Sequence, residues 1–177
     1  MKGILFSEFI VLVEDTFGLE MCQEMLDLND NEGNYTSVGS YDHKELIKLI
    51  MTLSKLTNIP VEELQEVYGA AVFNQLYQSM PSLEGQSNTT FDFIKSVENY
   101  IHIEVKKLYP NANPPRFNFI SSSETELVMD YISVRCLSHV CFGLIKGCAA
   151  HFKEEIEIKM HAINSDNTHV RFHLAHL

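Results

Sequence analysis

The sequence has few basic residues for its size, and its cysteines form no paired motif. Lysine and arginine number 13 against 24 aspartates and glutamates, so the 177 residues carry a formal net charge of −11. Nucleic acids and anionic membrane surfaces are bound through clustered Lys and Arg. The negative net charge of this sequence therefore argues against both classes of partner. The four cysteines contain no CxxC pair and are too sparse for a disulfide framework. We expect reduced thiols that pack as small hydrophobic side chains.

The sequence also lacks a hydrophobic run of the roughly 18 residues that a membrane span needs. Its apolar start, residues 4–13, is interrupted by Glu8 and ended by Glu14 and Asp15. No small-residue cleavage site follows, so this start is not typical of a secretory signal peptide, and we expect a cytoplasmic protein. The length and the 45% hydrophobic content suit one globular domain over residues 1–177.

Hydrophobic periodicity predicts an α+β fold with a mostly helical N-terminal part. Helices are expected over residues 3–17 and 19–27, over the apolar positions from 46 to 56, from Pro60 through position 76, and from Thr90 to Leu108. Polar loops are expected over 28–41 and 81–90. Prolines at 110, 114 and 115 end the last of these helices. A small antiparallel sheet plus one helix should follow, with strands near 116–121, 124–134, 155–163 and 168–176 and a helix near 136–151.

The run Tyr131-Ile132-Ser133-Val134-Arg135 is the clearest sign of a binding site. In an extended segment alternate residues share a face, so Tyr131, Ser133 and Arg135 would present two hydroxyls and a guanidinium together. Ile132 and Val134 would turn into apolar packing. A guanidinium pairs with carboxylate oxygens and hydroxyls take the remaining lone pairs, so the run suits a ligand that carries carboxylates. Taken alone, it is equally a strand with a polar face.

His102 lies one residue off the apolar stripe of the predicted fifth helix, which consists of Phe91, Ile94, Val97, Ile101, Val105 and Leu108. An isolated helical histidine is often only a half-buried polar residue. A neutral imidazole, however, donates a nitrogen lone pair to iron. Haem has two carboxylates and takes one imidazole, so His102 and the Tyr-Ser-Arg run suit the same ligand.

Further segments, in their order and spacing, resemble a single family. They are Met1-Lys2-Gly3-Ile4-Leu5, Ile101-His102-Ile103, Asn113-Pro114-Pro115-Arg116 and Gly143-Leu144-Ile145-Lys146-Gly147, together with the Tyr-Ser-Arg run. Over essentially its whole length the sequence resembles the H-NOX family, the haem nitric oxide/oxygen binding domains of bacterial gas sensors, which are related to the haem domain of soluble guanylate cyclase. The resemblance implies one molecule of haem b (iron protoporphyrin IX), buried between the helical part and the strand part.

The resemblance also implies roles for individual residues. His102 is expected to be the axial ligand of the haem iron. Tyr131, Ser133 and Arg135 are expected to hold the propionates, and Pro115 is expected to press on the macrocycle and bend it.

The residues on the other, distal face of the haem decide which gas is bound. A hydrogen-bond donor there would stabilise bound oxygen by roughly 1.5–3 kcal/mol, and relatives that bind oxygen stably carry a distal tyrosine where this sequence has Val140. The resemblance implies a hydrocarbon distal face made of Leu5, Phe9, Val140 and Leu144. Asn74 and Tyr77 on the predicted fourth helix are the remaining candidate donors.

The function expected from the resemblance is gas sensing without catalysis. The protein would bind NO and CO at ferrous iron, exclude oxygen and signal by loss of the iron–His102 bond, because NO weakens the bond trans to itself. The chain ends near Leu177 with no kinase, cyclase or methyl-accepting segment. A separate effector is therefore expected, typically a histidine kinase or a cyclic-di-GMP enzyme in bacteria.

Three alternatives stay open. The nearest is an oxygen-binding sensor of the same family, which differs only in a distal donor. A haem enzyme such as a peroxidase needs a distal acid–base pair, for which His139 is the only nearby candidate. A haem-free domain that binds an apolar carboxylate would keep Arg135 as the anchor but leave His102 without a role.

Overall fold

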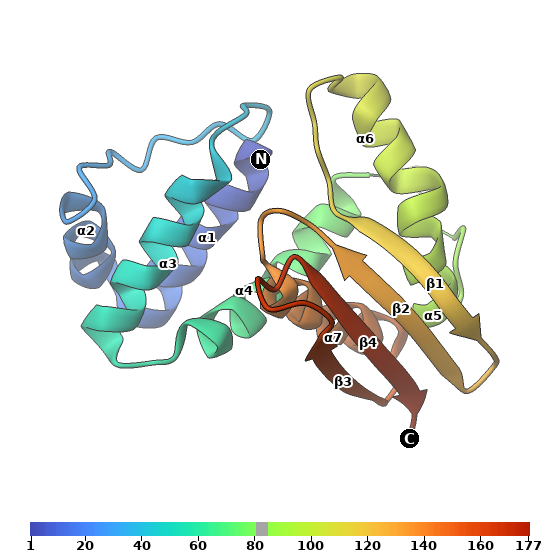
Figure 1. Ribbon diagram of the computed structural model, residues 1–177. Helices are drawn as coiled ribbons and strands as arrows, with labels where there is room; N and C mark the ends of the chain where they lie inside the picture. Colours follow the sequence, from blue (N-terminus) through green and yellow to red (C-terminus); the bar gives the residue numbers. More distant parts are fainter. Residues whose placement is uncertain (81–84) are drawn as a thin grey trace.

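The computed structural model describes residues 1–80 and 85–177, with the backbone alone for Leu108. Its first half is helical, as the periodicity predicts: α1 (Gly3–Phe17), α2 (Leu19–Asp27), α3 (His43–Thr57) and α4 (Val61–Gln78). Of the loop predicted over 81–90, residues 81–84 lie outside the described residues. The helices α1, α2 and α3 form a lobe to one side of the sheet, and α4 runs from this lobe towards the sheet (Figure 1).

Local signals in the sequence determine where these helices begin and end. Gly18 adopts a φ of 86°, a conformation that glycine takes without a steric penalty, and it separates α1 from α2. Asp42 accepts the backbone N–H of Lys44 at 3.0 Å and so caps the start of α3. Asn58 ends the same helix in the left-handed region. The apolar core of the helical lobe extends to Leu137 and Val140 of the C-terminal half, and its other members include Phe6, Phe9, Val13, Met25, Leu46, Leu49, Ile50, Leu53 and Tyr68.

The predicted fifth helix is continuous in space but is not a single α-helix. It consists of α5 (Thr90–Ser96), a π-helical turn η2 (Val97–Ile101) and α6 (His102–Leu108). The backbone N–H of His102 accordingly bonds the carbonyl of Val97, five residues earlier. Such π turns are rare and frequently occur at functional sites.

The C-terminal half contains an antiparallel sheet and one long helix, as predicted. Its elements are β1 (Arg116–Ser122), β2 (Glu126–Ile132), α7 (Ser138–Phe152), β3 (Ile156–Ala162) and β4 (His169–His176). The strands lie in the order β1-β2-β4-β3, and every neighbouring pair is antiparallel. One face of the sheet packs against α7 and α5, and the other is free of helices (Figure 1). The α+β fold expected from the sequence is thus confirmed.

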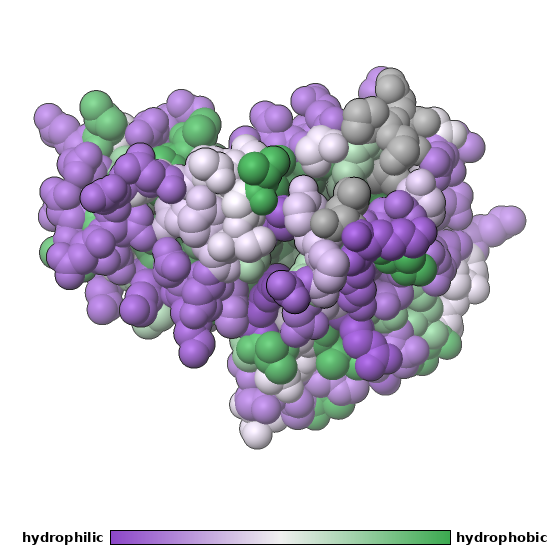
Figure 2. All heavy atoms as spheres, turned by 90° about the horizontal axis from the view of Figure 1, so that it is seen from above, coloured by the Kyte–Doolittle hydropathy of each residue, from purple (hydrophilic) through white to green (hydrophobic). Residues whose placement is uncertain are grey.

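Close contact between α4 and α7 joins the two halves. A Cβ atom added at Gly143 of α7 would lie 2.1 Å from the carbonyl oxygen of Glu66, and one added at Gly69 of α4 would lie 2.2 Å from that of Val140. Glycine at these positions lets the two helix backbones touch. Seen from above, the surface is hollowed at the junction of the two halves, and weakly polar and apolar surfaces border the hollow (Figure 2). Among the described residues, no helix is long and apolar enough to cross a lipid bilayer.

Candidate functional site

Tyr131, Ser133 and Arg135 come together at a turn, whereas the sequence predicts a strand. Strand β2 ends at Ile132, and the Oγ of Ser133 accepts the backbone N–H of Arg135 at 3.2 Å. Serine hydroxyls compete with strand pairing in this way by satisfying a nearby backbone donor. Val134, which the extended prediction turns into apolar packing, is 72% exposed. That prediction is therefore wrong for residues 133–135.

The charge of Arg135 in this turn acts on two groups of the helical lobe, the α-amine of Met1 and the imidazole of His43. Burial, followed by the charge of Arg135, lowers the pKa values of the Met1 amine and of His43. Burial also lowers the pKa of Arg135 itself. Asp42 partly offsets this positive charge, with one carboxylate oxygen 3.2 Å from Nδ1 of His43. We call the Met1 amine, His43 and Arg135 the cationic cluster, in which the lowered pKa of His43 favours its neutral form and Arg135 is the main source of positive charge.

Arg135 itself has no anionic partner within residues 1–80 and 85–177. Its guanidinium makes no hydrogen bond or ion pair with any of these residues, although the side chain is half-buried. An unpaired buried cation costs free energy, which a bound anion would recover. The cationic cluster therefore fits a ligand that carries carboxylates.

Aromatic side chains connect this region to His102. Tyr131 is buried, which raises the pKa of its hydroxyl to about 12, and its ring centroid lies 6.1 Å from that of Phe117. Phe117 in turn stacks against His102, with centroids 5.6 Å apart and the ring planes 25° apart. Pro115 lies half-buried in the segment between α6 and β1.

His102 has the features of a metal ligand. Its side chain is only 14% exposed, and Nδ1 lies 3.1 Å from Oε2 of Glu98. Burial lowers the pKa of His102 and outweighs the opposing effect of Glu98, so the neutral ring is favoured. With Nδ1 donating to Glu98, the lone pair stands on Nε2, which forms no hydrogen bond with the described residues. Glu98 was not among the sequence-predicted site residues, although a four-residue spacing on a helix signals such a pair.

The four predicted distal side chains belong to one apolar cluster. Phe9 and Val140 are buried in the core cluster of the helical lobe, and Leu5 and Leu144 pack against it. Leu144 also packs against the cluster that contains Ile101, next to His102. The distal set and the helix of His102 are thus connected through one leucine.

Of the candidate distal donors, Asn74 is exposed on α4. Tyr77 packs its ring against Phe73 and His151, with centroids 6.0 and 4.4 Å away. Tyr68 is a buried phenol that sequence reasoning missed, although it stands four residues from Leu64 and from Val72 on the apolar stripe of α4.

Tyr68 contacts the distal set through both its ring and its hydroxyl. The ring packs edge-on against Phe9, with centroids 5.4 Å apart. The hydroxyl donates to the carbonyl oxygen of Leu5 at 2.6 Å. The phenol proton is therefore already engaged with the backbone.

A helical lobe joined to an antiparallel sheet, with a largely buried imidazole at the start of α6 and a guanidinium that has no anionic partner among the described residues, fits the class of haem-binding sensor domains. Residues 2–160 match the family model described as Haem-NO-binding (HNOB), and the chain belongs to this family. The resemblance to H-NOX proteins seen in the sequence is thereby confirmed. A search of curated proteins gives no match.

Solved structures agree with this assignment. The unliganded Fe(II) H-NOX protein from K. algicida is 36% identical, with a TM-score of 0.93 over 100% of this chain and 97% of that one. The H-NOX protein from Shewanella woodyi, solved in the Fe(II)CO state with IWP-051 bound, is 35% identical, with a TM-score of 0.84 over 100% and 95%. The protein from S. oneidensis in the Fe(II)NO state shares the fold, with 24% identity and a TM-score of 0.90 over 100% and 99%.

Proposed function

We propose that this protein is a haem-based sensor that binds NO and CO at ferrous iron, excludes oxygen and regulates a separate effector. The observation that carries the proposal is the combination of His102, whose Nε2 is free of hydrogen bonds with the described residues, with the guanidinium of Arg135, which has no anionic partner among them. Haem b has both complementary features, an iron that takes an imidazole and two carboxylates. The resemblance to the H-NOX proteins of K. algicida and Shewanella woodyi supports the same cofactor.

In this proposal each group of residues has one task. His102 ligates the iron through Nε2, and Arg135, Ser133 and Tyr131 hold the propionates, with Arg135 supplying most of the attraction. Pro115 presses on the ring and bends it. When bound, haem supplies the iron at which the gas is taken up.

Oxygen is excluded because the distal side chains offer it no hydrogen bond. Leu5, Phe9, Val140 and Leu144 carry only hydrocarbon, and the hydroxyl of Tyr68 is already engaged by the Leu5 carbonyl. Without a donor, bound oxygen lacks roughly 1.5–3 kcal/mol of stabilisation, about tenfold or more in affinity. NO and CO need little such help.

His102 also carries the signal. Bound haem would supply an iron whose bond to His102 weakens when NO is taken up, and release of the imidazole would free α6 from its tether. The helical lobe then shifts against the sheet half about the close α4–α7 contact, and the surface shown to the effector changes. The effector in this proposal is a histidine kinase or a cyclic-di-GMP enzyme in the bacterial cytoplasm.

Visible absorption spectra test the proposal directly. The purified protein is reduced anaerobically and exposed first to air and then to NO. We expect a ferrous haem spectrum that air leaves unchanged, and an NO spectrum of the type that lacks a histidine ligand. A stable oxygen complex in air would make the protein an oxygen sensor, with Tyr68, Asn74 or Tyr77 as the donor. A protein that takes up no haem on reconstitution would overturn the proposal.

The peroxidase alternative gains nothing from the structure. His139 directs Nδ1 at Glu66 of α4, 3.0 Å away, so its ring is held in the contact between the two helices. It is therefore not available as an acid–base group above the iron.

A further inference from the structure

We propose that Glu98 is a positioning residue for His102, which holds the ring in the tautomer that binds iron and sets the strength of the iron–histidine bond. The inference rests on the proposed function, because it takes His102 as the axial ligand. It gives a role to the carboxylate of Glu98, which has none in the proposed function.

A single carboxylate oxygen of Glu98 makes both contacts that matter. Oε2 lies 3.1 Å from Nδ1 of His102, and it accepts the backbone N–H of Phe117 at 3.1 Å. The side chain of Glu98 is only 27% exposed and that of His102 only 14%. Glu98 is thus held from outside its own helix by the first residues of β1, and it holds His102 in turn.

The ring of His102 is also fixed from its flat side. Phe117 donates its backbone N–H to Glu98 and stacks its side chain on the imidazole, so one residue of β1 contacts both partners. The carboxylate sets the direction of Nδ1, and the stacked phenyl sets the plane of the ring. Together they leave Nε2 as the free ligand atom.

The π turn belongs to this arrangement. Glu98 is its second residue, and His102 is the first residue after it. A π turn costs helical hydrogen-bond geometry and is usually retained where it re-aims a side chain. Here it lies between the carboxylate and the imidazole that it orients.

A carboxylate that accepts the distant N–H of a metal-bound imidazole makes that imidazole a more basic ligand. A more basic ligand binds iron more strongly and stabilises the ferric state relative to the ferrous state. Glu98 should therefore lower the reduction potential of the haem. It should also oppose the release of His102 when NO binds, and so set how readily the sensor switches.

The test compares Glu98→Gln and Glu98→Ala in the haem-loaded protein. Outer-shell partners of this kind change metal affinity by about 10–100-fold. We expect His102 release on NO binding to become about tenfold more favourable in Glu98→Ala, with a smaller change in Glu98→Gln. The iron–histidine stretching frequency in the resonance Raman spectrum should fall, and the midpoint potential should rise, in the same order.

Glu104→Gln is the matched control. Glu104 lies two residues beyond His102 on α6 and pairs with Lys107 at 2.7 Å, so its loss removes the same charge from the same helix without touching the imidazole. If both glutamine variants shift the potential equally and leave the stretching frequency unchanged, Glu98 acts only as a distant charge and the inference is wrong. Should Glu98→Ala fail to fold, the near-isosteric Glu98→Gln decides alone.

The two proposals fail in different ways. A wild-type protein that takes up no haem contradicts the proposed function. A wild-type protein with a normal ferrous haem spectrum, whose stretching frequency and potential are the same in all Glu98 variants, contradicts only the role of Glu98.

Discussion

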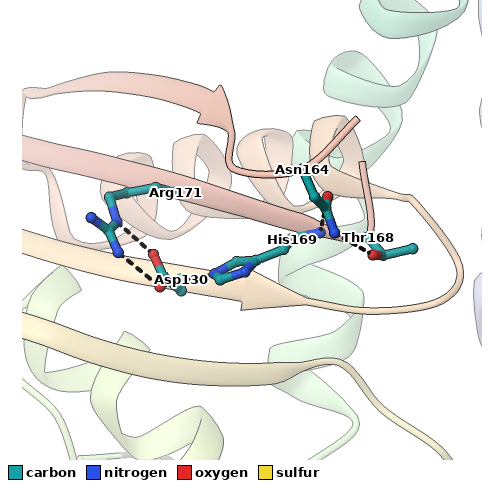
Figure 3. A network of polar contacts seen from close by, with 5 residues as sticks. All are labelled: Asp130, Asn164, Thr168, His169 and Arg171. Carbon is teal, nitrogen blue, oxygen red and sulfur yellow. Dashed lines mark hydrogen bonds and ion pairs between the residues drawn. The ribbon is translucent and has the colours of Figure 1, made fainter. Parts of the chain in front are cut away.

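Among single residues outside the candidate site, Asp130 shows how a buried charge is held in this fold. It lies on β2 with a side chain only 4% exposed, and Arg171 of β4 pairs with it through two bonds, Nε to Oδ1 at 2.7 Å and Nη2 to Oδ2 at 3.0 Å (Figure 3). Nε2 of His169 lies 2.9 Å from Oδ2. Hydrogen bonding from Arg171 lowers the pKa of Asp130, against the opposite effect of burial. The carboxylate thus fastens β2 to β4 on the face of the sheet that no helix covers.

Asp130→Asn should lower the free energy of unfolding at pH 7 by about 2 kcal/mol, the size of a charged hydrogen bond. The folded pKa lies below the unfolded value of about 3.9, so between the two the unfolded chain holds a proton that the folded one does not. The contribution is therefore complete above about pH 5 and is lost as the pH falls through the lowered pKa.

Urea unfolding at pH 7, 5, 4 and 3 measures this difference. The gap between wild type and Asp130→Asn should narrow as the pH falls. Glu157→Gln on β3, which removes an exposed pair with Lys159, should change stability by less than about 0.5 kcal/mol throughout. A gap for Asp130→Asn that stays constant with pH would show that the carboxylate charge contributes nothing.

At the scale of elements, the sequence predicts those helices and strands whose apolar spacing is regular and whose ends are marked by residues such as glycine. The ends of α1 and α2 agree with prediction because Gly18 interrupts an otherwise continuous apolar pattern. The π turn was missed because its apolar residues Val97 and Ile101 keep a four-residue spacing that an α-helix allows equally. The turn at 133–135 was missed because alternation does not reveal that a serine hydroxyl takes a backbone N–H.

The residues of the candidate site likewise fall into those that the sequence can suggest and those that only the structure reveals. Residue types and a family resemblance are enough to propose His102, Arg135 and the apolar distal set, which stay predictions. Glu98 comes to attention only through its contact with a distant segment, the backbone of Phe117, and the Met1 amine through its contact with the carbonyl of Tyr41 and the charge of Arg135. Such contacts follow from the packing of elements and leave no pattern along the chain.

Gly143→Ala tests whether contact between α4 and α7 holds the halves together. The new Cβ would lie 2.1 Å from the carbonyl oxygen of Glu66 and 2.8 Å from the backbone nitrogen of Ala70, so the two helix backbones must separate. Overpacking of this kind costs about 1–3 kcal/mol, which exceeds the gain of about 1 kcal/mol in helix propensity. We expect a net loss of stability in thermal unfolding, and altered kinetics of His102 release.

Lys146→Ala is the control on the same helix. It removes a partly exposed pair with Glu66 at 3.6 Å and a contact of the ammonium with the ring of Phe142, and it leaves the backbone contact intact, so the midpoint of unfolding should change little. Equal midpoints for Gly143→Ala and wild type would mean that the helices can separate without cost, which contradicts a close contact that couples the halves.

For the molecule as a whole, the cationic cluster spans the junction of the two halves. The Met1 amine and His43 belong to the helical lobe, and Arg135 belongs to the sheet half. The positive charge of Arg135 disfavours the charged forms of the Met1 amine and of His43 across this junction, and Asp42 offsets part of the effect on both. A ligand with two carboxylates would be attracted from both sides of the junction, so we expect cofactor binding to stabilise the entire fold.

Arg135→Ala should therefore destabilise the haem-loaded form of the protein and not the haem-free form. Loss of a charge-assisted bond of roughly 1.5–3 kcal/mol should speed haem transfer to apomyoglobin about tenfold or more and lower the melting temperature of the haem-loaded form. The haem-free form should lose no stability, because the variant removes an unpaired buried cation. Arg116→Ala on β1, an exposed arginine of the same half, supplies the control for net charge. If both variants release haem at the same rate, Arg135 does not hold the propionates. If Arg135→Ala destabilises the haem-free form as much as the loaded one, its role is in packing, and the junction is not held by an anion.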